Sequence, residues 1–183
     1  MSERPLRVRQ LEERIAERAR LLKIEQRPIM QELSKAGIYM LEVNEACLSE
    51  EQFRTAAPIF MKHLKSQKYS QLTLEILAGT FDRKDASDYW DDLVEIYLSQ
   101  PETKPEGYGD LTMALTAALS TLATTKHIPA IVDMLRDSRL RDRVLLLSPL
   151  RRRRRDPKIA AIIEELRKDP YFSKEINSWR PLK

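Results

Sequence analysis

Arginines are the side chains in this sequence with the clearest capacity for binding chemistry. Five of them follow one another at Arg151–Arg155, and Arg139 and Arg143 precede Arg151 by multiples of four residues. Such spacings place Arg139, Arg143, Arg151 and Arg155 on one ridge if a single helix carries them all. Guanidinium groups pair with both oxygens of a carboxylate or phosphate. The predicted partner-binding arginines are Arg139, Arg143, Arg151, Arg152, Arg154 and Arg155.

Several interpretations of this basic segment stay open. The ridge can contact an acidic protein surface, or it can follow the phosphates of a nucleic acid. A basic run also serves as an import signal in eukaryotes. The structural alternative is a solvated helix end that the helix dipole stabilises. The ridge requires the helix to continue through Pro149, where a proline removes a backbone donor.

Acidic side chains form a second group. Asp88, Asp92 and Glu95 follow one another at spacings of four and three, which places them on one face of a helix. A face of this kind can bind a cation or a basic partner, and a solvated acidic face is the alternative. We therefore include Asp88, Asp92 and Glu95 among the candidate partner-binding residues.

No combination of residues predicts catalysis. Cys47 has His63 and His127 as candidate bases, but no third residue that would orient them is evident. Two separated histidines are also a weak basis for a metal site. The segment around Trp90 is similar to the Trp–Asp segment of the helical-repeat alkylpurine DNA glycosylases, but Val94 stands where those enzymes have their catalytic Asp. We predict no enzymatic activity, no cofactor and no metal.

The apolar spacing that must position these residues is helical. Ile159, Ile162, Ile163 and Leu166 share one face, between two Asp-Pro pairs that start and end a helix. Apolar and proline positions recur with separations of 31 and 71 residues along the chain. Recurrence with a period between twenty and fifty residues is typical of a helical repeat protein.

The sequence D-S-R-L-R-D-R-V-L-L-L, followed by D-P-K-I-A-A-I-I-E-E-L-R-K-D-P, resembles a HEAT repeat. Asp137 and Arg143 match positions where that family favours Asp and Arg, and Asp156-Pro157 matches its interhelix turn. The resemblance is best over residues 109–170. It implies an all-α fold, a right-handed α-solenoid of stacked antiparallel helix pairs with capping helices at both ends. The family includes many functions, so the resemblance implies little chemistry.

We expect one domain over residues 1–183. Residues 1–36 form an N-terminal helix, residues 37–170 the HEAT-like repeats, and residues 171–183 a C-terminal cap. Within the first segment, Val8, Leu11, Ile15 and Leu22 approximate a heptad stripe. This stripe predicts a helix that caps the first repeat, with dimerisation or partner binding as the alternative. Pro28 is expected to restart or kink the helix.

Composition limits the classes of function. Residues 136–183 hold 15 Lys and Arg against 7 Asp and Glu, whereas residues 69–135 hold 4 against 11. An acidic middle and a basic end favour charged partners. A single cysteine fits a reducing compartment, and neither a signal peptide nor a membrane span is evident. We expect a cytoplasmic, non-enzymatic HEAT-like adaptor or scaffold that binds another protein through its repeat surface and its basic C-terminal region. Nucleic-acid binding through the arginine ridge is the alternative, and a glycosylase-like enzyme is a distant third. The sequence leaves the oligomeric state open.

Overall fold

The computed structural model describes residues 4–43, 48–107 and 109–180, and within these ranges the chain is helical without strands. The predicted all-α class is therefore confirmed. The α-helices are α1 (Arg4–Lys35), α2 (Glu50–Ser66), α3 (Gln71–Gly79), α4 (Trp90–Leu98), α5 (Leu111–Leu122), α6 (Ile128–Arg136), α7 (Leu147–Arg152), α8 (Pro157–Leu166) and α9 (Pro170–Asn177). Short 3₁₀ helices precede three of them, namely η2 (Lys84–Tyr89), η3 (Thr125–His127) and η4 (Arg143–Leu146).

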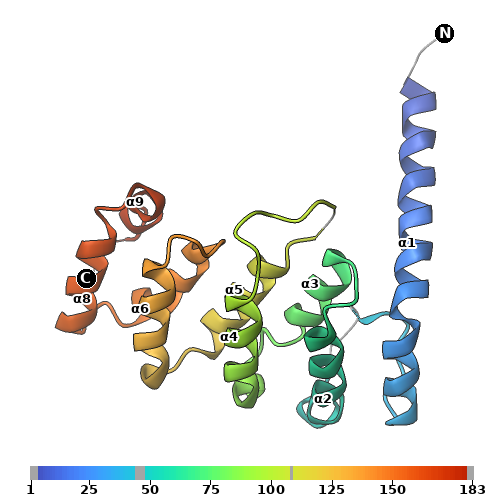
Figure 1. The fold of residues 1–183 in the computed structure, drawn as a ribbon, viewed down its shortest axis with the longest axis horizontal. Helices are drawn as coiled ribbons and strands as arrows, with labels where there is room; N and C mark the ends of the chain where they lie inside the picture. The colour runs from blue at the N-terminus through green and yellow to red at the C-terminus, as the bar shows by residue number, and fades with distance from the viewer. Residues whose placement is uncertain (1–3, 44–47, 108, 181–183) are drawn as a thin grey trace.

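The helices lie in a row that follows the order of the chain. Helix α1 stands at one end of the molecule and helices α8 and α9 at the other (Figure 1). Helix α3 packs closely against α5, which also contacts α4, α7 and η4, while α2 lies between α1 and α3. Contacts therefore join elements that are near neighbours along the chain.

Helix boundaries follow the signals in the sequence. Ser49 accepts a hydrogen bond from the Gln52 amide while the Gln52 side chain accepts one from the Ser49 amide, which is a capping box. Asp110 and Asp156 cap α5 and α8 in the same way through their carboxylates. Gly37 ends α1 with a φ of 81°, a conformation that suits glycine. The helix predicted between the two Asp-Pro pairs is therefore confirmed as α8.

Helix α1 is a single helix that runs through Pro28, so no new helix starts there. Its C-terminal half packs on the body with Ile29 and Leu33 fully buried. The N-terminal half instead stands away from the other helices (Figure 1), and Val8 and Ile15 are 54% and 59% exposed. The favoured expectation, a helix lying on the first repeat, therefore fits only the part of α1 that follows about residue 23.

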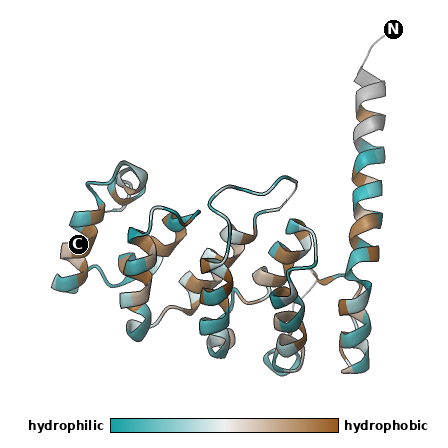
Figure 2. Ribbon diagram, viewed as in Figure 1, coloured by the Kyte–Doolittle hydropathy of each residue, from teal (hydrophilic) through white to brown (hydrophobic). Residues whose placement is uncertain are grey.

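The core is a continuous apolar layer along the row of helices. Figure 2 shows hydrophobic residues on the helix faces that meet one another. The largest fully buried side chains are aromatic, since a row of short helices leaves wide gaps that large rings fill. They are Tyr97, Phe53, Phe60, Phe81 and Phe172.

Polar bonds between helices recur at a similar separation in sequence. Glu32 accepts from Lys62, 30 residues on, and Thr112 donates to Asp142, also 30 residues on. Arg136 donates to Glu165 across 29 residues. Longer separations, such as the 48 residues between Glu25 and Thr73, also occur. These three separations lie close to the apolar separation of 31 residues, whereas other interhelix bonds span 25, 35 and 44 residues.

Candidate functional site

The segment between Asp137 and Leu150 is not the continuous helix that an arginine ridge requires. Residues 137–142 form a turn, Asp142 has a φ of 55°, and α7 begins only at Leu147 after the 3₁₀ helix η4. Helix α7 then ends at Arg152, and residues 153–156 turn into α8. Pro149 lies in the first turn of α7 and is buried, so the helix continues past this proline and the break lies before it. Arg139 and Arg155 are therefore not on one helix, and the predicted ridge is wrong.

Arg143 is a buried side chain whose guanidinium binds two backbone carbonyls. Its guanidinium donates to Leu135 O at 2.5 Å and to Leu140 O at 3.0 Å. The same group lies over the rings of Tyr171 and Phe172, with its Cζ 4.7 and 5.1 Å from their centres. Only 5% of the residue is exposed. Arg143 therefore joins the end of α6 to α9, and no surface is left for a partner.

Arg139 is exposed and is paired within its own turn. Its guanidinium donates to both carboxylate oxygens of Asp137, at 3.0 and 2.7 Å. Hydrogen bonds from the Arg139 side chain and amide lower the pKa of Asp137 to about 2, so the carboxylate stays charged. An arginine with a carboxylate at this distance presents little net charge to a partner.

Arg152 and Arg153 face back toward helix α5. Arg152 donates to Ser120 O, and Arg153 donates to Ala123 O at 3.4 Å. Carbonyl groups at the C-terminal end of a helix have no intrahelical N–H donor. The two arginines therefore supply hydrogen-bond donors to carbonyl oxygens that α5 leaves unpaired. Burial, with the neighbouring charge of Arg153, lowers the pKa of Arg152. These two side chains thus hold α7 against the helix pair before it.

Of the remaining arginines of the run, Arg151 and Arg155 are exposed and Arg154 is half-buried. Arg151 lies over the Trp179 ring, with its Cζ 5.6 Å from the ring centre. An open hollow of about 510 Å³ lies beside it and is lined by one hydroxyl and four guanidinium side chains. We call this feature the arginine hollow, and its lining residues are Ser148, Arg151, Arg152, Arg154 and Arg155.

The arginine hollow differs in its charge balance from other arginine sites in the described part of the chain. Arg83, Arg136 and Arg141 each lie within 3.1 Å of a carboxylate oxygen. In contrast, the described contacts of Arg151–Arg155 are with carbonyl oxygens, a serine hydroxyl and an indole ring. Among the described residues, no ion pair joins Arg151–Arg155 to a carboxylate, and the nearby acidic residues Asp156 and Glu175 bind the Lys158 amide and the Trp179 indole instead.

The acidic candidates are spread over two elements. Asp88 lies in η2 and is exposed, whereas Asp92 and Glu95 lie in α4. Asp92 accepts from Lys65 of α2 at 2.5 Å, and this hydrogen bond raises the pKa of Lys65. Asp92 thus joins two helices, while Asp88 and Glu95 remain on the surface. Among described residues, no three metal-ligating side chains are grouped to hold an ion.

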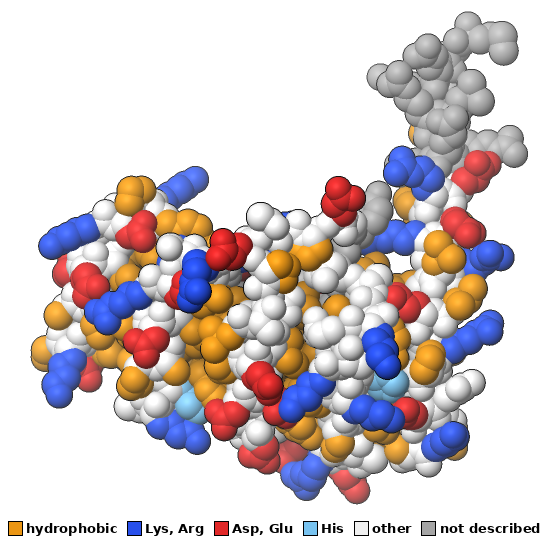
Figure 3. Space-filling model, viewed as in Figure 1, with side chains coloured by type: hydrophobic (Ala, Val, Ile, Leu, Met, Phe, Trp, Pro, Cys, Tyr) orange, Lys and Arg blue, Asp and Glu red, His pale blue; other side chains and the backbone are white. Residues whose placement is uncertain are grey.

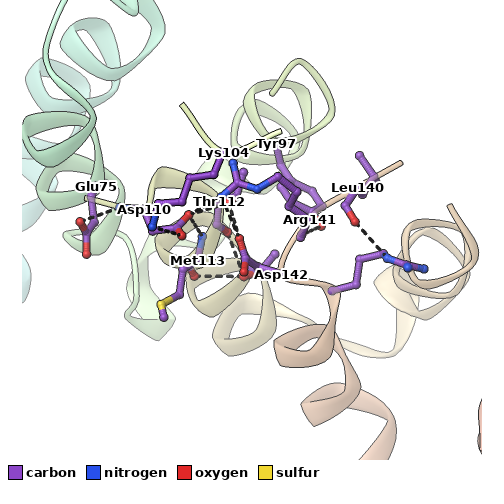
Figure 4. A network of polar contacts seen from close by, with 11 residues as sticks. Glu75, Tyr97, Lys104, Asp110, Thr112, Met113, Leu140, Arg141 and Asp142 are labelled. Carbon is purple, nitrogen blue, oxygen red and sulfur yellow. Dashed lines mark hydrogen bonds and ion pairs between the residues drawn. The ribbon is translucent and has the colours of Figure 1, made fainter. Parts of the chain in front are cut away.

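A polar network that sequence reasoning missed links three consecutive parts of the row (Figure 4). Asp110 accepts from Arg141 at 3.0 Å and lies 2.9 Å from the Lys104 amine, while its amide donates to Glu75 of α3. The Tyr97 hydroxyl donates to the Arg141 carbonyl at 2.6 Å. Burial alone would raise the pKa of Asp110, but its hydrogen bonds and the nearby cations hold it below its usual range. The network joins Asp110 to α3 on one side and to the turn before η4 on the other.

The histidines have structural partners. His127 stacks on Trp90 with ring centres 3.9 Å apart and planes within 5°, and burial lowers its pKa. His63 Nδ1 lies 2.6 Å from the Tyr69 hydroxyl, and burial lowers the pKa of His63 as well. Cys47 lies outside the described residues. The two histidines occupy separate parts of the row and do not form a shared site.

Comparisons with known proteins returned no relative. No protein-family model, curated protein or solved structure matched the chain. Among the helices of the described residues, none has the length and apolar character needed to cross a bilayer. Inferences about function therefore rest on the contacts described above.

Proposed function

We propose that this chain is a non-enzymatic protein-interaction module built as a right-handed solenoid of HEAT-like helix pairs. The row of helices and the recurrence of interhelix bonds near thirty residues support the repeat assignment over residues 37–170. Residues 1–36 then precede the first repeat, and residues 171–183 follow the last. The single cysteine keeps the cytoplasm as the proposed location.

The observation that carries the interaction proposal is the N-terminal half of α1. Val8 and Ile15 are seven residues apart and therefore share a face, and both are more than half exposed. Hydrophobic side chains are visible along this part of the helix between charged groups (Figure 3). A helix that packs on nothing is marginal in water, and apolar side chains in solvent mark contact surfaces. A protein partner that covers this face accounts for both features.

Nucleic-acid binding is the second candidate, and the arginine hollow favours it. Phosphate contacts of unbalanced arginines release counterions and provide affinity without sequence selectivity. The arrangement of the run weakens this candidate, because Arg143 is buried and Arg152 and Arg153 bind carbonyls of α5. A compact hollow supports contact with one anionic group better than contact with a long phosphate backbone.

Affinity capture with the full chain tests the proposed function. The bait is compared with Val8→Gln/Ile15→Gln, which removes the apolar face, and with Glu17→Gln/Arg20→Gln, which alters the opposite face without changing net charge. Extract from the source organism is used with and without nuclease treatment, between about 50 mM and 200 mM salt. We expect at least one protein to bind the wild type and the control across this range but not the apolar-face variant. Equal capture by all three baits, or capture that nuclease abolishes, would refute the proposal.

A further inference from the structure

The arginine hollow brings more positive charge together than a single carboxylate can neutralise. Four guanidinium groups line it beside the Ser148 hydroxyl, and no carboxylate belongs to the lining. The five arginines are consecutive, so the turn over residues 153–156 concentrates charges that a longer helix would distribute around its circumference. Mutual repulsion in this place favours the binding of an anion with more than one negative charge.

Several side chains of the hollow are held in position before any ligand arrives. Arg152 donates to Ser120 O and to Ser148 Oγ, the latter at 3.3 Å, while Arg151 lies over Trp179. Trp179 is in turn fixed by its indole N–H, which donates to Glu175 at 2.9 Å. Side chains that are already ordered lose less conformational entropy on binding. Arg154 and Arg155 complete the lining.

We propose that the arginine hollow binds a phosphate monoester carried by a protein partner, such as a phosphoserine or phosphothreonine side chain. A phosphate monoester carries nearly two negative charges at neutral pH and has three strong acceptor oxygens. These oxygens match the paired N–H groups of arginines, and the Ser148 hydroxyl adds one neutral donor. The inference rests on the proposed interaction function, because it names the chemistry that one region of the module recognises.

Phosphopeptide chemistry fits the hollow better than a nucleic-acid strand does. A strand presents phosphates in succession, each with a single charge, and it requires a basic path that continues beyond one hollow. Here Arg143 is buried and Arg139 is paired with Asp137, so the charge does not continue along the helices before the hollow. A single dianionic group matches a single concentration of arginines.

The test measures fluorescence polarisation of labelled peptides against the full chain. Three Gly/Ser peptides of equal length carry one phosphoserine, one glutamate or one serine at the centre, and single-stranded and duplex DNA of equal length serve as the fourth and fifth probes. The variant Arg154→Gln/Arg155→Gln removes two arginines of the hollow. The matched control Arg136→Gln/Arg139→Gln removes the same charge from arginines that pair with carboxylates.

We expect the phosphoserine peptide to bind at least about tenfold more tightly than the glutamate or serine peptide, because charge-assisted hydrogen bonds to extra oxygens are added. Affinity should fall at least about tenfold in the hollow variant and less than about threefold in the control. Binding should also weaken as the pH falls below about 6, where the phosphate gains a proton. All three results together support the proposal.

Other outcomes overturn it. Equal binding of the glutamate and phosphoserine peptides would show a carboxylate site, which refutes the inference but leaves the interaction module standing. Tighter binding of either DNA, with loss in the hollow variant, would favour the nucleic-acid alternative and refute the inference. If no probe binds, the hollow is a solvated basic surface, and the proposed function then depends on the capture experiment with the α1 variants alone.

Discussion

Replacement of Arg143 by alanine tests whether the arginines divide into buried structural and surface groups. Arg143→Ala removes the donors to Leu135 O and Leu140 O. A buried polar group without a partner costs about 1–3 kcal/mol. The cost at Leu140 lies at the low end because that residue is only half-buried. The two carbonyls together therefore cost about 3 kcal/mol. Loss of the cation over the α9 rings adds to this destabilisation.

The expected loss is large enough to measure by thermal unfolding. About 3 kcal/mol corresponds to a fall in Tm of about 6–12 °C for a chain of this size. Far-UV circular dichroism would follow the helices, with Arg139→Ala and Arg155→Ala as controls that change the same side chain at the surface. We expect both controls to unfold within a few degrees of the wild type. The reasoning fails if Arg143→Ala unfolds with the wild type, or if all three variants lose the same stability.

Three further changes have defined outcomes. Gly109→Ala places a Cβ 2.6–2.8 Å from the backbone at the start of α3 at a φ of 100°, so we expect a clear fall in the urea midpoint. Glu25→Gln weakens the hydrogen bond that the Ser70 amide donates to the Glu25 carboxylate before α3. Burial raises the pKa of Glu25, but hydrogen bonds outweigh it and lower the pKa overall. After solvent screening, the charged Glu25 carboxylate stabilises the fold by about 1 kcal/mol. This stabilisation is complete above the ordinary pKa of a carboxyl group and is lost as the pH falls through the lowered pKa of Glu25. The urea unfolding curves of Glu25→Gln and the wild type should therefore converge at low pH. Burial lowers the pKa of His127, so the protein should lose stability as pH falls below the ordinary histidine value. Trp90 fluorescence should report that loss, and a His127→Gln variant should show less of it.

Local chemistry explains which parts of the fold the sequence predicts. The capping residues Ser49, Asp110 and Asp156 act on amides within three residues, so their effect depends on neighbouring sequence alone. The apolar spacing of α8 is equally local. These features identify helices and their ends without knowledge of what lies beside them.

The arginine ridge fails as a prediction because long-range contacts decide the conformation between Asp137 and Leu150. Asp142 takes a left-handed conformation while accepting a hydrogen bond from Thr112, which is 30 residues earlier. Arg143 then finds acceptors on α6 and rings on α9. Apolar periodicity alone is compatible with one long helix, since it contains no information about these partners.

The position of α1 shows another limit of periodicity. The stripe that includes Val8 and Ile15 predicts which residues are apolar on one face, but not whether another element covers that face. The polar network around Asp110 was predictable in principle, because Asp110 and Arg141 are 31 residues apart, the same separation as between apolar positions. A search for opposite charges at the repeat spacing would have found this pair.

The recurring interhelix bonds also constrain how the chain can change in length. Asp110 reaches Arg141 after 31 residues and Glu32 reaches Lys62 after 30, so a deletion of a few residues between partners would rotate one helix away from its acceptor. In the repeat architecture proposed above, removal or duplication of a whole unit would disturb the remaining contacts less than a deletion of a few residues. On that proposal, such a chain would gain and lose length most readily in complete units, and its two ends could diverge into separate binding regions while the units between them continue to fit together.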